Sequence, residues 1–143
     1  MNLNLIDAYH RFGAKPGHRL RCLSAIAADG AVVLTCAQGY FGHPARGVLR
    51  YEDRLSRESQ DSRHVQLLGQ HLTLARTGDL PVRMVVAVVA NPNCSVVSGY
   101  HVRPDLIGKV TMFDGDHFMI DFTRCVPPDA EVPKGRGKRR RLN

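Results

Sequence analysis

The sequence predicts a single α+β domain: a mainly antiparallel sheet of five to six strands with one amphipathic helix packed on it and a short N-terminal helix. Three observations predict this class. Runs of β-type residues outnumber helical ones, two Asp-Gly pairs mark hairpin turns, and one longer segment repeats apolar residues at helical spacing. With 143 residues the chain has the length of one domain, because compact domains cluster near roughly 100–150 residues.

The N-terminal part of the chain predicts a short helix followed by a hairpin. Residues 4–12 repeat apolar side chains at helical spacing, and Gly13 ends the pattern. Residues 19–28 and 31–40 are β-type runs on either side of Asp29-Gly30, a pair that favours a tight turn. A two-residue turn gives this hairpin one buried face, formed by Leu23, Ala25, Ala27, Val32, Leu34 and Cys36.

The middle of the chain predicts a loop, a strand and the main helix. Residues 39–47 contain three glycines and a proline, which favours an open loop, and residues 48–55 form a third β-type run. The helix begins after Ser59 or Ser62, either of which suits an N-cap, and ends near Gly78. Its apolar stripe consists of Val65, Leu68, Leu72 and Ala75.

The last third of the domain predicts a central strand and a second hairpin. Residues 82–89 are almost continuously apolar, which is typical of a strand covered on both faces, whereas residues 91–106 are irregular. Residues 109–113 and 117–123 then flank Asp114-Gly115-Asp116. A two-residue turn there gives one face that the main helix must cover, made of Thr111, Phe113, Phe118, Ile120 and Phe122.

The composition favours a folded domain with a separate basic end. The chain is 43% hydrophobic and 23% charged, which is typical of a globular protein rather than a disordered one. Most of its net charge of +7 is carried by Lys134, Arg136, Lys138, Arg139, Arg140 and Arg141. Residues 1–133 hold 14 basic and 13 acidic residues, a net charge of +1. Because apolar periodicity stops at Pro127, we expect a globular domain over residues 1–126 and a flexible basic tail over 127–143.

The cysteines and the termini bear on metal binding and location. Cys22, Cys36, Cys94 and Cys125 include no Cys-x-x-Cys pair, the spacing that zinc sites need, so we expect neither metal nor cofactor. A three-residue turn in the first hairpin would set Cys22 opposite Cys36. No secretory leader opens the chain and no apolar run approaches the roughly 20 residues that span a bilayer, so we expect a cytoplasmic protein away from membranes. Arginine outnumbers lysine 16 to 4, which favours a bacterial source.

Two segments combine aromatic, imidazole and guanidinium side chains. The first holds Tyr40, Phe41, His43 and Arg46, and the second holds Tyr100, His101 and Arg103. Aromatic rings stack on bases and guanidinium groups bind phosphates, so this pattern suits single-stranded nucleic acid or a phosphorylated metabolite. The simpler alternative is that the rings close the ends of the core while the arginines are solvated.

A third cluster lies at the second hairpin. Three carboxylates and an imidazole within eight residues, those of Asp114, Asp116, His117 and Asp121, have the donor types of a divalent-metal site. However, aspartate is favoured at tight turns for backbone reasons, and Asp121 lies on the strand face opposite the aromatic one. The turn is therefore the preferred interpretation.

These patterns lead to one functional hypothesis and two rivals. The first is a non-enzymatic module for nucleic acid or another polyanion, with ordered contacts from the two aromatic segments and electrostatic attraction from the tail. The chain has no nucleophile elbow, dinucleotide fingerprint or Walker loop. The enzymatic rival is therefore a metal-independent nuclease or phosphate-ester hydrolase in which His43 and His101 act as acid and base, with Arg46 or Arg103 stabilising the transition state. The third hypothesis is a homodimeric protein-interaction adaptor.

Overall fold

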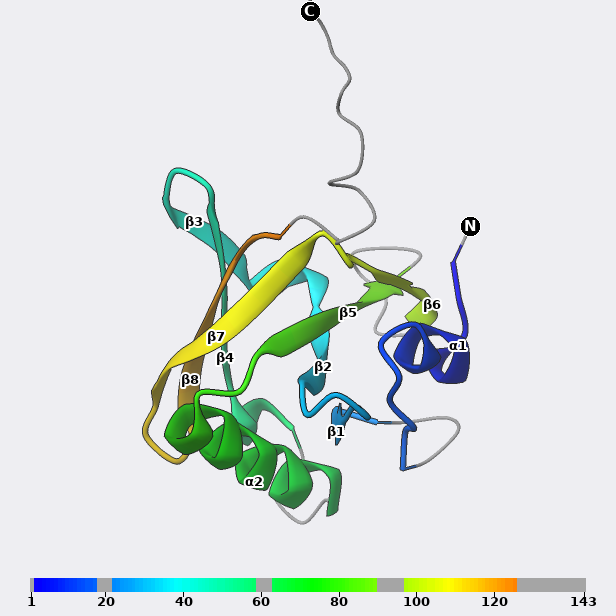
Figure 1. Ribbon diagram of the computed structural model, residues 1–143, viewed down its shortest axis with the longest axis horizontal. Helices are drawn as coiled ribbons and strands as arrows, with labels where there is room; N and C mark the ends of the chain where they lie inside the picture. The colour runs from blue at the N-terminus through cyan, green and yellow to red at the C-terminus, as the bar shows by residue number, and fades with distance from the viewer. Residues whose placement is uncertain (1, 18–21, 59–62, 90–96, 126–143) are drawn as a thin grey trace, which may run out of the picture.

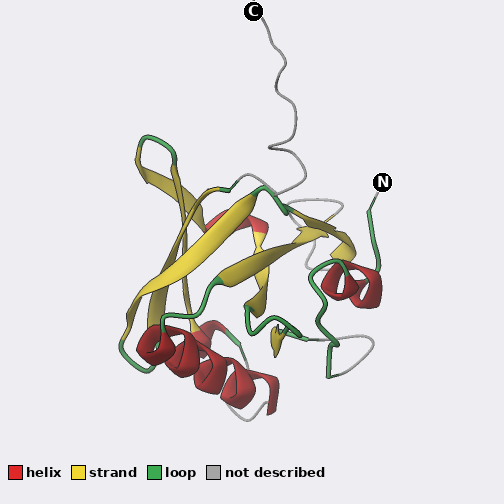
Figure 2. Ribbon diagram, in the orientation of Figure 1, coloured by secondary structure: helices red, strands yellow, loops and turns green. Residues whose placement is uncertain are grey.

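The structure, a computed structural model, describes residues 2–17, 22–58, 63–89 and 97–125. The helices in these ranges are α1 (Leu5–His10) and α2 (Arg63–Gly78). The strands are β1 (Ser24–Ile26), β2 (Val32–Ala37), β3 (Phe41–Ala45), β4 (Val48–Arg54), β5 (Val82–Val89), β6 (Val97–Val102), β7 (Leu106–Phe113) and β8 (His117–Arg124). Two short 3₁₀ turns, η1 (Gln38–Tyr40) and η2 (Leu55–Arg57), follow β2 and β4 (Figures 1 and 2).

The described strands form one mixed sheet. Their order is β1-β2-β5-β7-β8-β4-β3, and β6 pairs with β5. Strands β2 and β5 run parallel, from Val32 opposite Val82 to Ala37 opposite Ala87, whereas all other pairs in the sheet are antiparallel. The α+β class and the helix on the sheet are therefore confirmed. The expected sheet of five to six strands is too small by at least two, and the observed sheet contains one parallel pair, β2 and β5, which was not expected.

Strands β2 and β5 are covered on both faces, as the apolar run at residues 82–89 predicts. One set of alternate residues meets α2 in a cluster, here called the α2-side core, that includes Val32, Leu34, Cys36, Val82, Met84, Val86, Val65, Leu68 and Leu72. The other set meets α1 in the α1-side core, which includes Val33, Val85, Leu5, Ala8 and Tyr9. Figure 1 shows the two helices at different sides of the sheet.

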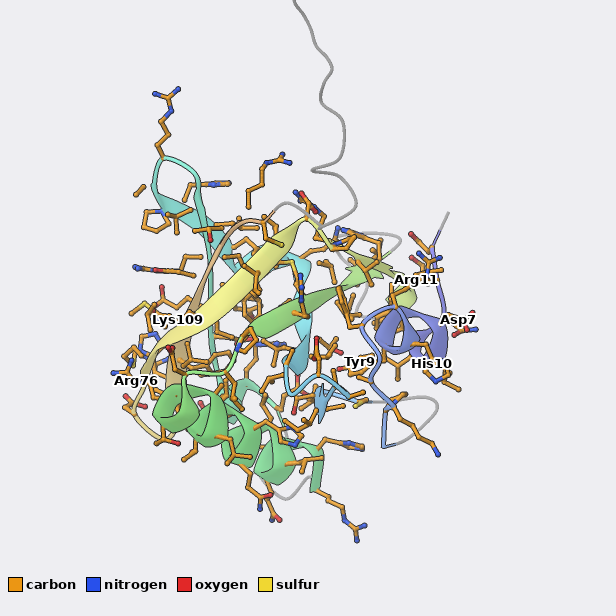
Figure 3. The ribbon with its side chains drawn as sticks, viewed as in Figure 1. Asp7, Tyr9, His10, Arg11, Arg76 and Lys109 are labelled. Atoms are coloured by element: carbon orange, nitrogen blue, oxygen red, sulfur yellow. The ribbon has the colours of Figure 1, made fainter. Side chains whose placement is uncertain are left out.

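Tyr9 anchors the short helix α1 to the sheet. Its side chain is fully buried, and its hydroxyl lies 2.7 Å from Oγ1 of Thr35 in β2. Figure 3 shows Tyr9 directed toward the sheet, whereas Asp7, His10 and Arg11 lie on the outer side of α1. The helix begins at Asn4, whose side-chain oxygen accepts the backbone N–H of Asp7 at 2.8 Å.

The second hairpin packs under α2 as its aromatic pattern predicts. Phe118, Ile120 and Phe122 are buried in the α2-side core, and Phe113 pairs with Phe118 across the turn. A bulge between Val110 and Met112 interrupts the pairing of β7 with β8, so Val110, opposite Ile120, lies on the buried face in place of the predicted Thr111. The guanidinium of Arg76, at the end of α2, donates to the carbonyl of Thr111 at this bulge (2.7 Å; Figure 3) and so ties the helix to β7.

The first hairpin differs from its predicted register. Ser24 pairs with Leu34, and Ala27 N–H donates to the Ala31 carbonyl, so the turn has three residues with Gly30 at φ +91°. The single buried face expected for a two-residue turn is therefore wrong: Ala25 and Ala27 face the α1-side core, whereas Val32, Leu34 and Cys36 face α2. Cys22 packs in the α1-side core, so the sheet separates it from Cys36.

Two segments with irregular patterns contain strands. Phe41–Ala45, within the predicted loop at 39–47, is the edge strand β3, and Gly47 turns the chain into β4 at φ +79°. An edge strand tolerates the Pro44 that would interrupt a central one. Val97–Val102, within the predicted irregular stretch 91–106, is β6 and pairs with β5. In both segments the neighbouring strand supplies hydrogen bonds that the local pattern does not indicate.

The end of α2 lies at the predicted stop. Gly78 is the last helical residue, and Asp79 takes the left-handed conformation at φ +54°. The N–H of Leu80 then donates to the carbonyl of Ala75 at 3.0 Å, which closes the last turn. The proposed caps Ser59 and Ser62 lie outside the described residues, as do Cys94 and the predicted tail. No helix in the described ranges is long and apolar enough to cross a membrane.

Gly108 is a position where the packing of the second hairpin can be tested. A Cβ placed there would lie 2.5 Å from the ring of Phe122, which is fully buried and cannot move into solvent. Gly108→Ala should therefore destabilise the fold by roughly 1–3 kcal/mol, measured by urea unfolding. Gly17→Ala, with nothing within 4 Å, is the control and should change stability little. Equal stability of the two variants would contradict this packing.

His71 provides a test of the contact between α2 and β1. Its Nδ1 lies 2.7 Å from Oγ of Ser24, both side chains are buried, and burial lowers the pKa of His71. The unfolded chain protonates this histidine below about pH 6.5 whereas the folded chain resists protonation, so the free energy of unfolding should fall as the pH drops through that value. His71→Gln should flatten this pH dependence. The exposed His10→Gln variant should keep it, and an unchanged slope in His71→Gln would refute the assignment.

Candidate functional site

An open depression of about 430 Å³ lies along β3 and beside β4. It is lined by Tyr40, Phe41, Gly42, His43, Pro44, Arg50 and Glu52. Three of these, Tyr40, Phe41 and His43, come from the first aromatic and basic segment of the sequence. Tyr40 ends η1, and Phe41 and His43 follow in the edge strand β3, which pairs with β4 through Phe41 opposite Tyr51 and Gly42 opposite Arg50.

The two aromatic rings of the depression have different environments. Phe41 is half-buried and packs against the α2-side core, with its ring centroid 5.0 Å from that of Tyr51. Tyr40, in contrast, is 43% exposed and is one of the large hydrophobic residues in the described chain that contact solvent. Phe41 therefore closes the end of the core, as the simpler alternative expects, whereas Tyr40 presents a ring to the outside.

His43 and Arg46 supply polar groups next to these rings. Arg46 lies at the tip of the β3–β4 hairpin, in the turn between Ala45 and Val48. Figure 1 shows this hairpin extending away from the body of the domain. Both side chains are exposed, and neither makes a hydrogen bond or ion pair in the part of the chain that the structure describes. Their donors are therefore available to a ligand.

A buried carboxylate lies behind the depression. Asp53 is 6% exposed and accepts hydrogen bonds from the Tyr51 hydroxyl (2.6 Å), the Arg54 N–H (2.8 Å) and both Nε and Nη2 of Arg57 (2.7 and 2.6 Å). Burial raises the pKa of the Asp53 carboxyl, but these hydrogen bonds lower it by more, so its pKa lies below the usual range. The Asp53–Arg57 pair is therefore ionised at neutral pH.

The same network reaches Tyr40 by two routes. The guanidinium carbon of Arg57 lies 4.6 Å from the centroid of the Tyr40 ring, a cation–π contact. The hydroxyl of Tyr51, which donates to Asp53, also accepts the N–H of Ala37, the residue that precedes η1. The sequence analysis missed Asp53 and Arg57. The sequence does contain a sign of them: Asp53 lies two residues after Tyr51, on the same face of its strand, and a carboxylate on a buried face needs a positively charged or hydrogen-bonding partner.

The outer face of β4 carries paired charges. Arg50 makes two parallel hydrogen bonds to the carboxylate of Asp121 (2.7 and 2.9 Å), and Glu52 lies 2.5 Å from Nε2 of His117. These pairs join β4 to β8 across the sheet. Since Arg50 faces Asp121 and the imidazole of His117 faces Glu52, these four side chains already have partners, and the polar groups left available to a ligand are those of His43 and Arg46.

The second predicted segment does not line this depression. Tyr100 is half-buried against the α1-side core, and its backbone pairs with Leu3. Arg103 makes two hydrogen bonds to Asp105 (3.0 and 2.9 Å), and His101, opposite Val86 in β6, does not line the depression. The structure therefore does not unite the two segments in this depression, nor His43 with His101. The roles assigned to the second segment stay predictions.

The acidic cluster of the second hairpin behaves as a turn. The carboxylate of Asp114 accepts the backbone N–H groups of Asp116 and His117 (2.9 and 2.7 Å), a local arrangement that favours aspartate at this position. Asp116 instead accepts from the N–H and hydroxyl of Ser56 in η2. Together with the pairs made by His117 and Asp121, these contacts direct the four side chains to different partners, which supports the turn interpretation.

Two Arg–Asp pairs in β4 and its surroundings allow a matched comparison. Asp53→Asn removes the charge of a buried pair and leaves Arg57 without its counterion, so it should lower the free energy of unfolding by roughly 2 kcal/mol or more. Asp121→Asn alters the more exposed pair with Arg50 and should cost at most about 1 kcal/mol. Urea unfolding of both variants is the measurement. A cost for Asp121→Asn as large as that for Asp53→Asn would contradict this ranking.

The chain matches no protein-family model and no curated protein. Among solved structures it is similar to the crystal structure of SUVH5 SRA in complex with fully methylated CG DNA, at 16% identity. The match covers 81% of this chain and 82% of that chain, with a TM-score of 0.37. At this TM-score the two backbones differ too much for the likeness to say anything about the fold or the ligand of this protein.

Proposed function

We propose that this protein is a non-enzymatic module that binds single-stranded nucleic acid through the β3–β4 hairpin and the depression beside it. The observation that carries the proposal is a sequence of three exposed side chains that begins just before this hairpin and follows it to its tip. They are the ring of Tyr40 at the end of η1, and the imidazole of His43 and guanidinium of Arg46, which lack partners in the described chain. A ring and nearby cations are the two elements that single-strand binding requires.

Each group has a chemical task in this proposal. The Tyr40 ring stacks on one base, an interaction that tolerates any base because all bases have a flat π-face. His43, when protonated, and Arg46, farther along at the hairpin tip, contact phosphate oxygens of the same strand. A single strand suits this arrangement better than a duplex, since its bases are free to leave the stack and reach an exposed ring.

The predicted basic tail adds attraction without selecting a sequence. Residues 1–126 hold 14 basic and 11 acidic residues, a net charge of +3 spread over the whole domain, so the domain itself attracts a polyanion weakly. The six cations between Lys134 and Arg141 would neutralise phosphates and release counterions, which makes affinity fall as salt rises. In this proposal the hairpin holds the base and the tail increases the local concentration of nucleic acid.

The test measures anisotropy of a fluorescent single-stranded oligonucleotide, as DNA and as RNA, with the duplex for comparison. Tyr40→Ala should weaken binding roughly tenfold, because stacking on one ring contributes about 1–3 kcal/mol. Arg46→Ala should weaken binding to all sequences alike and lower the salt slope by about one. Arg63→Ala, at an exposed arginine that begins α2, is the matched control and should bind as the parent does.

Deletion of residues 134–143 separates the tail from the hairpin. The truncated protein should show a flatter salt dependence, while Tyr40→Ala should still weaken its binding. The proposal is contradicted if the full-length chain has no measurable affinity for single strands, if Tyr40→Ala binds as tightly as the parent, or if the duplex binds more tightly than the single strand.

A further inference from the structure

We infer that Arg57 is a positioning residue that holds Tyr40 as a one-sided stacking surface, an inference that rests on the site proposed above. The guanidinium of Arg57 lies over the Tyr40 ring, 4.6 Å from its centroid, yet 43% of the tyrosine remains exposed. One face of the ring is thus covered by the arginine, and the other is left for a ligand.

Arg57 can fix the ring because its own position is fixed. Its Nε and Nη2 donate in parallel to the two oxygens of Asp53, so the guanidinium plane cannot rotate without breaking both hydrogen bonds. Asp53 is in turn held by the Tyr51 hydroxyl and the Arg54 N–H. A buried carboxylate without these donors would be strongly unfavourable, so the fold maintains the arrangement before any ligand binds.

The backbone that carries Tyr40 is held by the same carboxylate. Tyr51 donates its hydroxyl hydrogen to Asp53 and accepts the N–H of Ala37, which precedes η1. Tyr40 is the last residue of η1. Figure 2 shows this short turn between the end of β2 and the start of β3, close to the sheet that holds Tyr51. One buried group therefore orders both the ring and the turn from which it projects.

This arrangement selects a class of ligand. A base that stacks on a ring already held in place avoids the entropy cost of ordering that side chain, so we expect a gain in affinity of about three- to tenfold. A quaternary ammonium gains less, because a single exposed ring is only one wall of the aromatic cage that binds such cations. The outer face of Tyr40 therefore suits a flat neutral group, a nucleobase, rather than a quaternary ammonium.

A double-mutant cycle tests the positioning role. Arg57→Lys keeps a cation for Asp53 but removes the planar guanidinium and its paired donors. In the parent it should weaken single-strand binding about three- to tenfold, whereas in the Tyr40→Ala background it should have no further effect. Urea unfolding of each variant verifies that it is folded. An equal loss in both backgrounds would mean that Arg57 contacts the ligand directly and would overturn the inference, as would no loss in the parent.

A second measurement needs no ligand. The ring carbons of Tyr40 should relax as a rigid group in the free protein, and Arg57→Lys should make them markedly more mobile. Arg50→Lys, which alters the neighbouring Arg–Asp pair, should leave Tyr40 ring mobility unchanged. Equal ring mobility in the parent and in Arg57→Lys would overturn the positioning role, even if Tyr40→Ala abolishes binding and so supports the proposed function.

The ligand class is tested on the same ring signals. A single-stranded oligonucleotide should shift the Tyr40 resonances, and tetramethylammonium at the same concentration should not. A shift with tetramethylammonium would overturn the account of the one-sided ring. If the oligonucleotide shifts neither Tyr40 nor its neighbours, the proposed function fails together with the inference, which distinguishes that result from a failure of Arg57 alone.

Discussion

Strands β2 and β5 lie side by side in parallel, and both strands have buried residues on both faces of the sheet. Their alternate residues supply two separate cores, one under α2 and one under α1. Parallel neighbours require a long connection, which here contains the β3–β4 hairpin and α2. The need to bury both faces of this pair thus decides on which side of the sheet each helix lies. The β3–β4 hairpin, which belongs to the connection between the two strands, ends at the sheet edge and carries the candidate site.

The candidate site lies where the α2-side core ends. Phe41 and Tyr51 pack against each other there, with ring centroids 5.0 Å apart, and Asp53 follows Tyr51 on the same strand face. Because a buried carboxylate is tolerated only with donors, the fold brings Arg57 to Asp53, and Arg57 then lies under Tyr40. The same arginine that neutralises the buried Asp53 therefore supports the exposed ring of Tyr40, and the hairpin adds the imidazole of His43 and the guanidinium of Arg46.

The elements that sequence reasoning predicted well have strong local periodicity. The stripe of α2, the apolar run of β5 and the aromatic alternation of β8 each show which face must be buried, and each packs as expected. The strands β3 and β6 were missed because glycine, proline and polar residues weaken their pattern and the neighbouring strand supplies their hydrogen bonds. The first hairpin was placed one residue out of register, because Asp29-Gly30 is compatible with turns of two or three residues. The alanines beside the turn do not show which face of the strand is directed toward α1 and which toward α2.

For the candidate site, the sequence by itself determined the residue types: Tyr40, Phe41, His43 and Arg46 lie within one short segment, and a ring beside cations suggests a nucleic-acid ligand whatever the fold. The tertiary structure decided which of these groups meet solvent, and it packs Tyr100 against the α1-side core and pairs Arg103 with Asp105. It also brought Arg57 beneath Tyr40 through a carboxylate on another strand. Periodicity reports which face of an element is buried, but contacts between distant residues depend on strand order and register, which one chain's local pattern does not contain.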